Sequence, residues 1–124
     1  MIGKIEAIVL DTADPRGLAR FYAELLGLEV LHEDDGWIEL GRPGSQQPAL
    51  SFQHAPDHQP PQWPDPNHPQ QVHLDIRIDG DIEEAEKQAL ALGATRLGGG
   101  GATFRVYADP SGHPFCLCWG SAGT

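Results

Sequence analysis

The sequence predicts an α+β fold built from two consecutive βαβββ modules. Three observations lead to this prediction: strands with a period of two, two amphipathic helices with capping residues, and a weak internal repeat. The chain has 124 residues, of which 40% are hydrophobic and 21% charged, as in a globular protein of one domain. We therefore expect a curved mixed sheet with helices on its outer face and a concave cavity on the other.

The first module, residues 1–55, begins with an apolar strand at residues 5–12. A helix follows it, because Asp14 is a good N-cap residue and Pro15 suits the first helical position. Gly27 is typical of a residue that ends such a helix. The remaining strands of this module are expected at residues 28–32, 37–40 and 49–54.

Residues 56–70 connect the modules and hold six of the eleven prolines. Such a segment is either a linker or a loop laid over a site. Its one large aromatic residue, Trp63, favours an ordered loop.

The second module, residues 71–120, repeats the order of the first. Its opening strand, 71–78, alternates apolar residues with polar ones, among them His73, Asp75 and Arg77. That polar face suits either open water or the lining of a cavity. The later elements are expected at residues 81–92 for the helix and 94–97, 103–107 and 114–119 for the strands.

The repeat decides between these two interpretations. Leu26-Gly27 matches Leu92-Gly93 at an offset of 66 residues, and Pro48 matches Pro114 at the same offset. If the modules match, the apolar face of strand 71–78 packs under the second helix. His73, Asp75 and Arg77 then line the concave cavity.

Composition excludes several classes of partner. The formal net charge of −10 argues against nucleic acid and against anionic membranes, which need a basic surface. No segment has the roughly 20 apolar residues that span a bilayer. Cys116 and Cys118 are two residues apart on one strand, which is too far for easy bridging, so we expect reduced thiols in a cytoplasmic protein.

Several motifs together resemble the vicinal oxygen chelate superfamily, which contains glyoxalase I, bleomycin-resistance proteins and extradiol dioxygenases. The first-half motifs are Asp14-Pro15, Phe21-Tyr22 and Leu26-Gly27-Leu28, and the second-half motifs are His73, Leu92-Gly93-Ala94 and Asp109 to His113. Trp63 to Pro66, His73 to Asp75 and Gly112 to Leu117 are similar to a glyoxalase-like subgroup. The resemblance implies paired modules around a small-molecule site, and a homodimer.

The resemblance also implies where a metal would bind. The ligand positions of metal-dependent members fall here on Ala7, Leu50, His73 and Cys116. Ala7 and Leu50 cannot ligate, whereas a catalytic site normally has three protein ligands. We therefore expect no cofactor; if a divalent metal binds, His73 is its ligand, with a substitute partner such as Asp75 or His54.

His73 and Asp75 are the candidate catalytic residues, because a carboxylate oriented by a histidine can act as a general base. The alternatives are a histidine that hydrogen bonds a neighbour and an aspartate paired with Arg77 or Arg105. The candidate ligand-binding residues are Trp37, Phe52, His54, Trp63, Arg77, Arg105 and Cys116. For the cysteines the alternative is inert core thiols, and for the tryptophans it is core or lid packing.

Three functions stay open at this point. The first is metal-free binding of a small organic molecule, aromatic molecules included, in the cavity. The second is a metal-dependent lyase, isomerase or dioxygenase of the glyoxalase type. The third is a non-enzymatic interaction module. Aromatic residues expected in the cavity favour the first over the third, and the missing ligands favour the first over the second.

Overall fold

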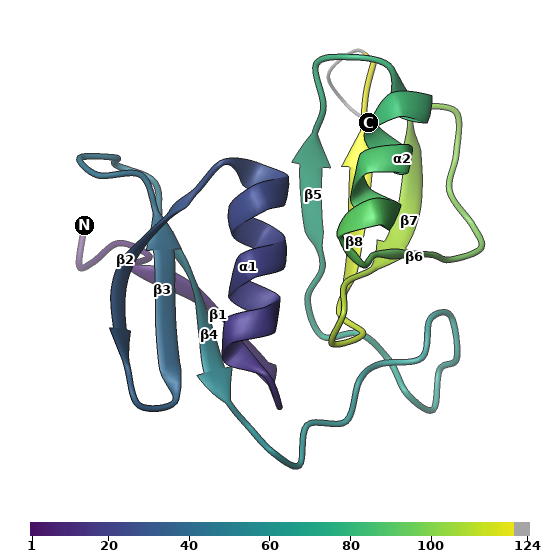
Figure 1. Ribbon diagram of the computed structural model, residues 1–124. Helices are drawn as coiled ribbons and strands as arrows, with labels where there is room; N and C mark the ends of the chain where they lie inside the picture. The colour runs from purple at the N-terminus through teal and green to yellow at the C-terminus, as the bar shows by residue number, and fades with distance from the viewer. Residues whose placement is uncertain (121–124) are drawn as a thin grey trace. The chain divides into compact units, whose positions relative to one another are not determined.

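The computed structural model describes residues 1–120 and confirms the α+β class and the two βαβββ modules (Figure 1). Each module has its own four-stranded mixed sheet, and the sheets do not close into a barrel. The chain divides into two compact units, Met1–His58 and the part from Gln59 onward. Most of the proline-rich segment therefore belongs with the second module. The single-domain organisation stays a prediction.

In the first module the sheet order is β1-β4-β3-β2, with β1 parallel to β4 and the other pairs antiparallel. Its elements are β1 (Ala7–Thr12), α1 (Pro15–Leu26), β2 (Glu29–Asp34), β3 (Trp37–Gly41) and β4 (Ala49–His54). The predicted caps of α1 are confirmed: the Asp14 carboxylate accepts a hydrogen bond from the backbone of Gly17, and Gly27 adopts the left-handed conformation.

The second module repeats this order as β5-β8-β7-β6. Its elements are β5 (Leu74–Arg77), α2 (Ile82–Leu92), β6 (Thr95–Arg96), β7 (Phe104–Ala108) and β8 (Pro114–Cys118). Strand β5 is shorter than predicted, so that His73 lies just before it. No helix within residues 1–120 is both long and apolar enough to cross a membrane.

Each module buries its core between its helix and one face of its sheet. In the first, the ring of Phe52 on β4 stacks on Tyr22 of α1 with centroids 5.7 Å apart, and both side chains are fully buried. In the second, Tyr107 stacks on Phe115 at 5.5 Å, and the Tyr107 hydroxyl donates to Glu86 of α2. These stacked rings identify the face of each sheet that its helix covers.

The repeat holds, but its uniform 66-residue offset is wrong for the last two strands of each module. Val9 pairs with Ser51 in the first module, whereas Asp75 pairs with Cys116 in the second. Val9 and Asp75 are 66 residues apart, but Ser51 and Cys116 are 65 apart. Ser51, not Leu50, therefore occupies the position that matches Cys116.

The cause is the connection between the last two strands. Residues 42–48 separate β3 from β4, and residues 109–113 separate β7 from β8. The second connection is two residues shorter. Compared with β3 and β4, the strands β7 and β8 are therefore each shifted by one residue from the 66-residue offset. Because neighbouring strand residues face opposite sides, a shift of one residue exchanges the two faces.

The proline-rich segment is ordered by contacts within the second module. The backbone of Gln62 donates to His68, and the carboxylate of Asp65 accepts from the backbone of Asn67. Gly112, with a φ of +88°, lies so close to Pro60 that a Cβ atom there would clash with the proline ring. The segment is therefore an ordered loop of this module, as the sequence favoured.

Candidate functional site

The candidate site is an apolar pocket of about 260 Å³ in the second module. It lies on the sheet face opposite α2, at the strand positions that alternate with the buried Tyr107, Phe115 and Leu117. Its lining residues are Trp63, Gln70, His73, Asp75, Phe104, Val106, Pro114, Cys116 and Cys118. Trp63 reaches it from the proline-rich loop, where its indole lies against Gly99.

One end of this pocket is polar. Nε2 of His73 lies 3.2 Å from Oδ1 of Asp75, with the two side chains 41% and 61% exposed. The sulfur of Cys116 on the neighbouring strand is within 4.8 Å of the ligand atoms of both. The structure therefore brings together three of the sequence-predicted residues, each from a position that the parallel pairing of β5 and β8 sets.

The two thiols at this end are free, as predicted, and both are buried. Burial, assisted by the charge of Asp75 and a hydrogen bond with it, raises the pKa of Cys116 to about 11. Burial also raises the pKa of Cys118. Both groups are therefore protonated at neutral pH, and neither is an activated nucleophile.

His73, Asp75 and Cys116 together form a set of possible metal ligands. A mixture of nitrogen, oxygen and sulfur donors suits zinc, whose ligand atoms lie roughly 3.3–3.6 Å apart when bonds are about 2.0–2.3 Å. Here the ligand atoms lie within 4.8 Å of one another, so the side chains must move closer together to bind an ion. The Cys116 proton must also leave before its sulfur can ligate. The three donors fit a zinc-type ion in kind.

Phe52 and His54 do not face the proposed site, and the expectation that they do is wrong. Phe52 is fully buried against Tyr22 of α1. His54 follows on the same face of β4 and lines a separate, polar hollow in the first module. The physical reason is that β4 is shifted by one residue from the uniform 66-residue offset, which exchanges its two faces.

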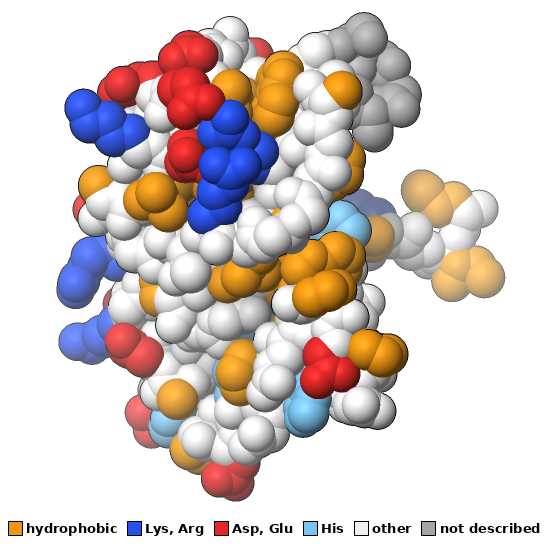
Figure 2. Space-filling model, turned by 90° about the vertical axis from the view of Figure 1, so that its right-hand side faces the viewer, with side chains coloured by type: hydrophobic (Ala, Val, Ile, Leu, Met, Phe, Trp, Pro, Cys, Tyr) orange, Lys and Arg blue, Asp and Glu red, His pale blue; other side chains and the backbone are white. Residues whose placement is uncertain are grey.

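Arg105 is misplaced for the same reason. It lies on the face of β7 toward α2, where Nη2 is 2.6 Å from Glu83 and Nη1 is 3.3 Å from Glu86. The hydrogen bond with Glu83 raises the pKa of Arg105, and that with Arg105 lowers the pKa of Glu83. Acidic and basic side chains lie side by side on the face drawn in Figure 2. Arg105 is thus a structural ion-pair residue.

Arg77 is exposed, and its Nη1 donates to the backbone carbonyl of Gly120 at 2.9 Å. It does not line the pocket, although Asp75, two residues earlier, and Cys118, its pairing partner on β8, do. Its charge nevertheless reaches Cys118, whose pKa it lowers against the larger effect of burial. Of the seven predicted ligand-binding residues, Trp63 and Cys116 are therefore the ones that line this pocket.

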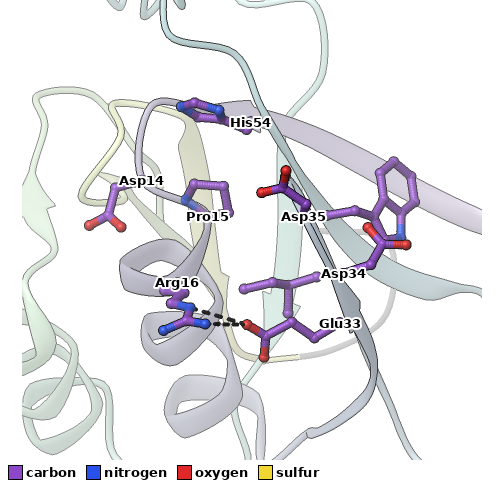
Figure 3. Close-up of a pocket in the computed structure, with 10 residues that line it drawn as sticks. Asp14, Pro15, Arg16, Glu33, Asp34, Asp35 and His54 are labelled. Atoms are coloured by element: carbon purple, nitrogen blue, oxygen red, sulfur yellow. Dashed lines mark hydrogen bonds and ion pairs between the residues drawn. The ribbon is translucent and has the colours of Figure 1, made fainter.

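Trp37 lines the hollow of the first module. His54 also lines this hollow (Figure 3). This hollow, about 670 Å³, is rich in carboxylates, and Asp14, Glu33 and Asp34 among them have local partners. Glu33 pairs with Arg16 at 3.1 Å, and the Asp14 carboxylate caps α1. We interpret these groups as a solvated, locally paired surface.

Sequence reasoning missed five lining residues, which are Gln70, Phe104, Val106, Pro114 and Cys118. The period of two in β7 places Phe104 and Val106 on one face, so the signal was present. The period of two does not reveal which face of the sheet the helix covers. Ser51, which matches Cys116 in the first module, is fully buried, and its hydroxyl has no hydrogen-bond partner within residues 1–120.

Comparison with known proteins agrees with this architecture. Residues 7–118 match the family described as the glyoxalase-like domain. No curated protein sequence matches the chain significantly.

Solved structures share the fold at low sequence identity. A glyoxalase/bleomycin resistance protein/dioxygenase family enzyme from Burkholderia phytofirmans PsJN has a TM-score of 0.74 at 15% identity, covering 94% of this chain and 98% of that one. The fosfomycin resistance protein FosX from Listeria monocytogenes has a TM-score of 0.72 at 16% identity, covering 98% and 97%. An antibiotic binding protein from Streptomyces sp. CB03234 has a TM-score of 0.61 at 20% identity, covering 97% and 98%.

The family match spans nearly all of both βαβββ modules, and these structures share their arrangement. The chain therefore belongs to the glyoxalase-like domain family of the vicinal oxygen chelate superfamily.

Proposed function

We propose that this protein binds a small aromatic or otherwise apolar molecule in the pocket of its second module, without a catalytic metal. The observation that carries the proposal is the pocket itself, in which flat aromatic and aliphatic side chains surround a few polar groups at one end. Its volume of about 260 Å³ suits a compact ligand. An antibiotic binding protein among the structures with this fold adds support for a binding role.

Two features of the pocket favour binding over catalysis. The thiol of Cys116 is protonated at neutral pH, because its pKa is about 11, so it offers no ready nucleophile. His73 and Asp75 lie together but are 41% and 61% exposed, so water competes for them. A general base in contact with ligand would act best in a drier setting.

A thermal-shift screen against aromatic and 2-oxo compounds tests this proposal. A compound at 100 times its dissociation constant should stabilise the protein by about 2.7 kcal/mol. Trp63→Ala should weaken the response, because Trp63 lines the pocket. Trp37→Ala, in the first module, is the matched control and should leave the thermal shift caused by the compound unchanged. If no compound shifts the wild-type transition, the binding proposal fails.

A metal-dependent enzyme of the glyoxalase type is the second candidate. The observation that favours it is the cluster of His73, Asp75 and Cys116, which would hold the ion. A bound divalent ion would supply Lewis-acid polarisation of a carbonyl or hydroxyl oxygen. A variant of the Listeria protein has been described with Mn(II) and a dihydroxypropylphosphonic acid.

Elemental analysis of the purified chain separates the two candidates. About one equivalent of metal in the wild type, lost in His73→Ala, supports the metal-dependent enzyme. Metal well below one equivalent in both proteins removes it and leaves the binding proposal standing.

A further inference from the structure

We infer that the second-module pocket selects an uncharged planar molecule carrying a hydroxyl donor, and that it discriminates against carboxylates and other anions. This inference rests on the proposed function and adds the chemical class of the ligand. It follows from the distribution of charge and hydrogen-bonding groups around the pocket.

The polar end of the pocket carries a negative charge. Asp75 is the one acidic residue among those that line it, and its carboxylate lies 3.2 Å from His73. The Asp75 carboxylate also lies within 4.8 Å of the sulfur of Cys116 on the neighbouring strand, and both residues line the pocket. An anionic ligand in the pocket would be repelled by this carboxylate.

No lysine or arginine of the described chain lines the pocket to offset that charge. Arg105 lies on the other face of the sheet, paired with Glu83. Arg77 is outside the lining and donates to Gly120. An anion would therefore lose its hydration at the apolar walls without gaining a cationic partner, which is unfavourable.

The same end is rich in hydrogen-bond acceptors. In the His73 tautomer whose Nε2–H donates a hydrogen bond to Asp75, the other ring nitrogen, Nδ1, is an acceptor. The carboxylate of Asp75 offers further acceptor sites. A ligand hydroxyl is the complementary donor, while the rings of Trp63 and Phe104 provide apolar walls for a planar body.

Isothermal titration calorimetry of the full chain at neutral pH with three probes of one ring system tests this. Naphthol supplies a donor, methoxynaphthalene supplies none, and naphthoate is an anion. We expect naphthol to bind about 3–10-fold more tightly than methoxynaphthalene, as for one hydrogen bond. We expect naphthoate to bind at least about tenfold more weakly than naphthol.

Asp75→Asn removes the charge and keeps the shape at a largely exposed side chain. It should bring naphthoate affinity toward that of naphthol and leave methoxynaphthalene unchanged. Glu83→Gln is the matched control, because it removes one negative charge on the other face of the sheet. It should leave all three affinities unchanged.

The outcomes distinguish the two proposals. If none of the probes binds the wild type, this inference loses its basis together with the proposed function. If all three bind with equal affinity, or if Asp75→Asn leaves the preference unaltered, the pocket binds aromatics but the charge selection is overturned.

Discussion

Replacing Phe52 by alanine tests which face of the first sheet its helix covers. The Phe52 side chain is fully buried and stacks on Tyr22, and both Tyr22 and Leu40 are also fully buried. Neighbours enclosed in this way cannot collapse into the space. The substitution should therefore cost about 3–5 kcal/mol of the free energy of unfolding. For a chain of this size that corresponds to a fall of roughly 10–20 °C in Tm.

The assay is thermal unfolding followed by circular dichroism, with probe affinity measured by calorimetry well below the transition. Phe104→Ala is the paired variant, because Phe104 lines the pocket and is half-buried. It should reduce Tm less than Phe52→Ala does and weaken the affinity for naphthol. Our face assignment is refuted if Phe52→Ala keeps the wild-type Tm but loses probe binding.

Three further changes probe other parts of the structure. Arg105→Ala should lower Tm at neutral pH without changing probe affinity. Because Arg105 lowers the pKa of Glu83, the difference in Tm between variant and wild type should shrink as pH falls below 4.5. A difference in Tm that stays constant with pH would count against the ion pair. The raised pKa of Cys116 contributes stability that is fully present below pH 9.0 and is lost as pH rises toward about 11. Alkylation of the Cys116 thiol by iodoacetamide should therefore accelerate over that pH range. Rapid alkylation at neutral pH would contradict the raised pKa. Gly112→Ala should cost about 1–2 kcal/mol or more in urea denaturation because its φ is +88°, while Gly80→Ala should be nearly neutral; equal effects would refute the turn geometry.

Local sequence signals were sufficient for the elements that they describe. Asp14, Pro15 and Gly27 gave α1 its bounds because capping is decided within one turn of the helix. The turn before β8 is held by local contacts of the same kind, since the Asp109 carboxylate accepts hydrogen bonds from the backbone of Ser111 and His113. The period of two placed His73 and Asp75 on one side of β5, where the structure has them.

Pairing register was not readable in the same way. The connection before β8 is two residues shorter than that before β4, and nothing local to Phe52 or Arg105 reports this difference. Each of these residues suits either face: an aromatic ring can be core or cavity wall, and a guanidinium can pair with a helix or a ligand. The long-range strand pairing determines which face each residue occupies, and therefore which candidate residues share a site.

The central claim is that a small aromatic molecule binds in the second module, beside His73. Backbone chemical-shift mapping of the isotope-labelled protein during titration with naphthol tests it most directly. We predict saturable shifts at residues that line the pocket, such as Trp63, His73 and Val106. Shifts concentrated instead at Trp37 and His54, around the hollow of the first module, would contradict the assignment.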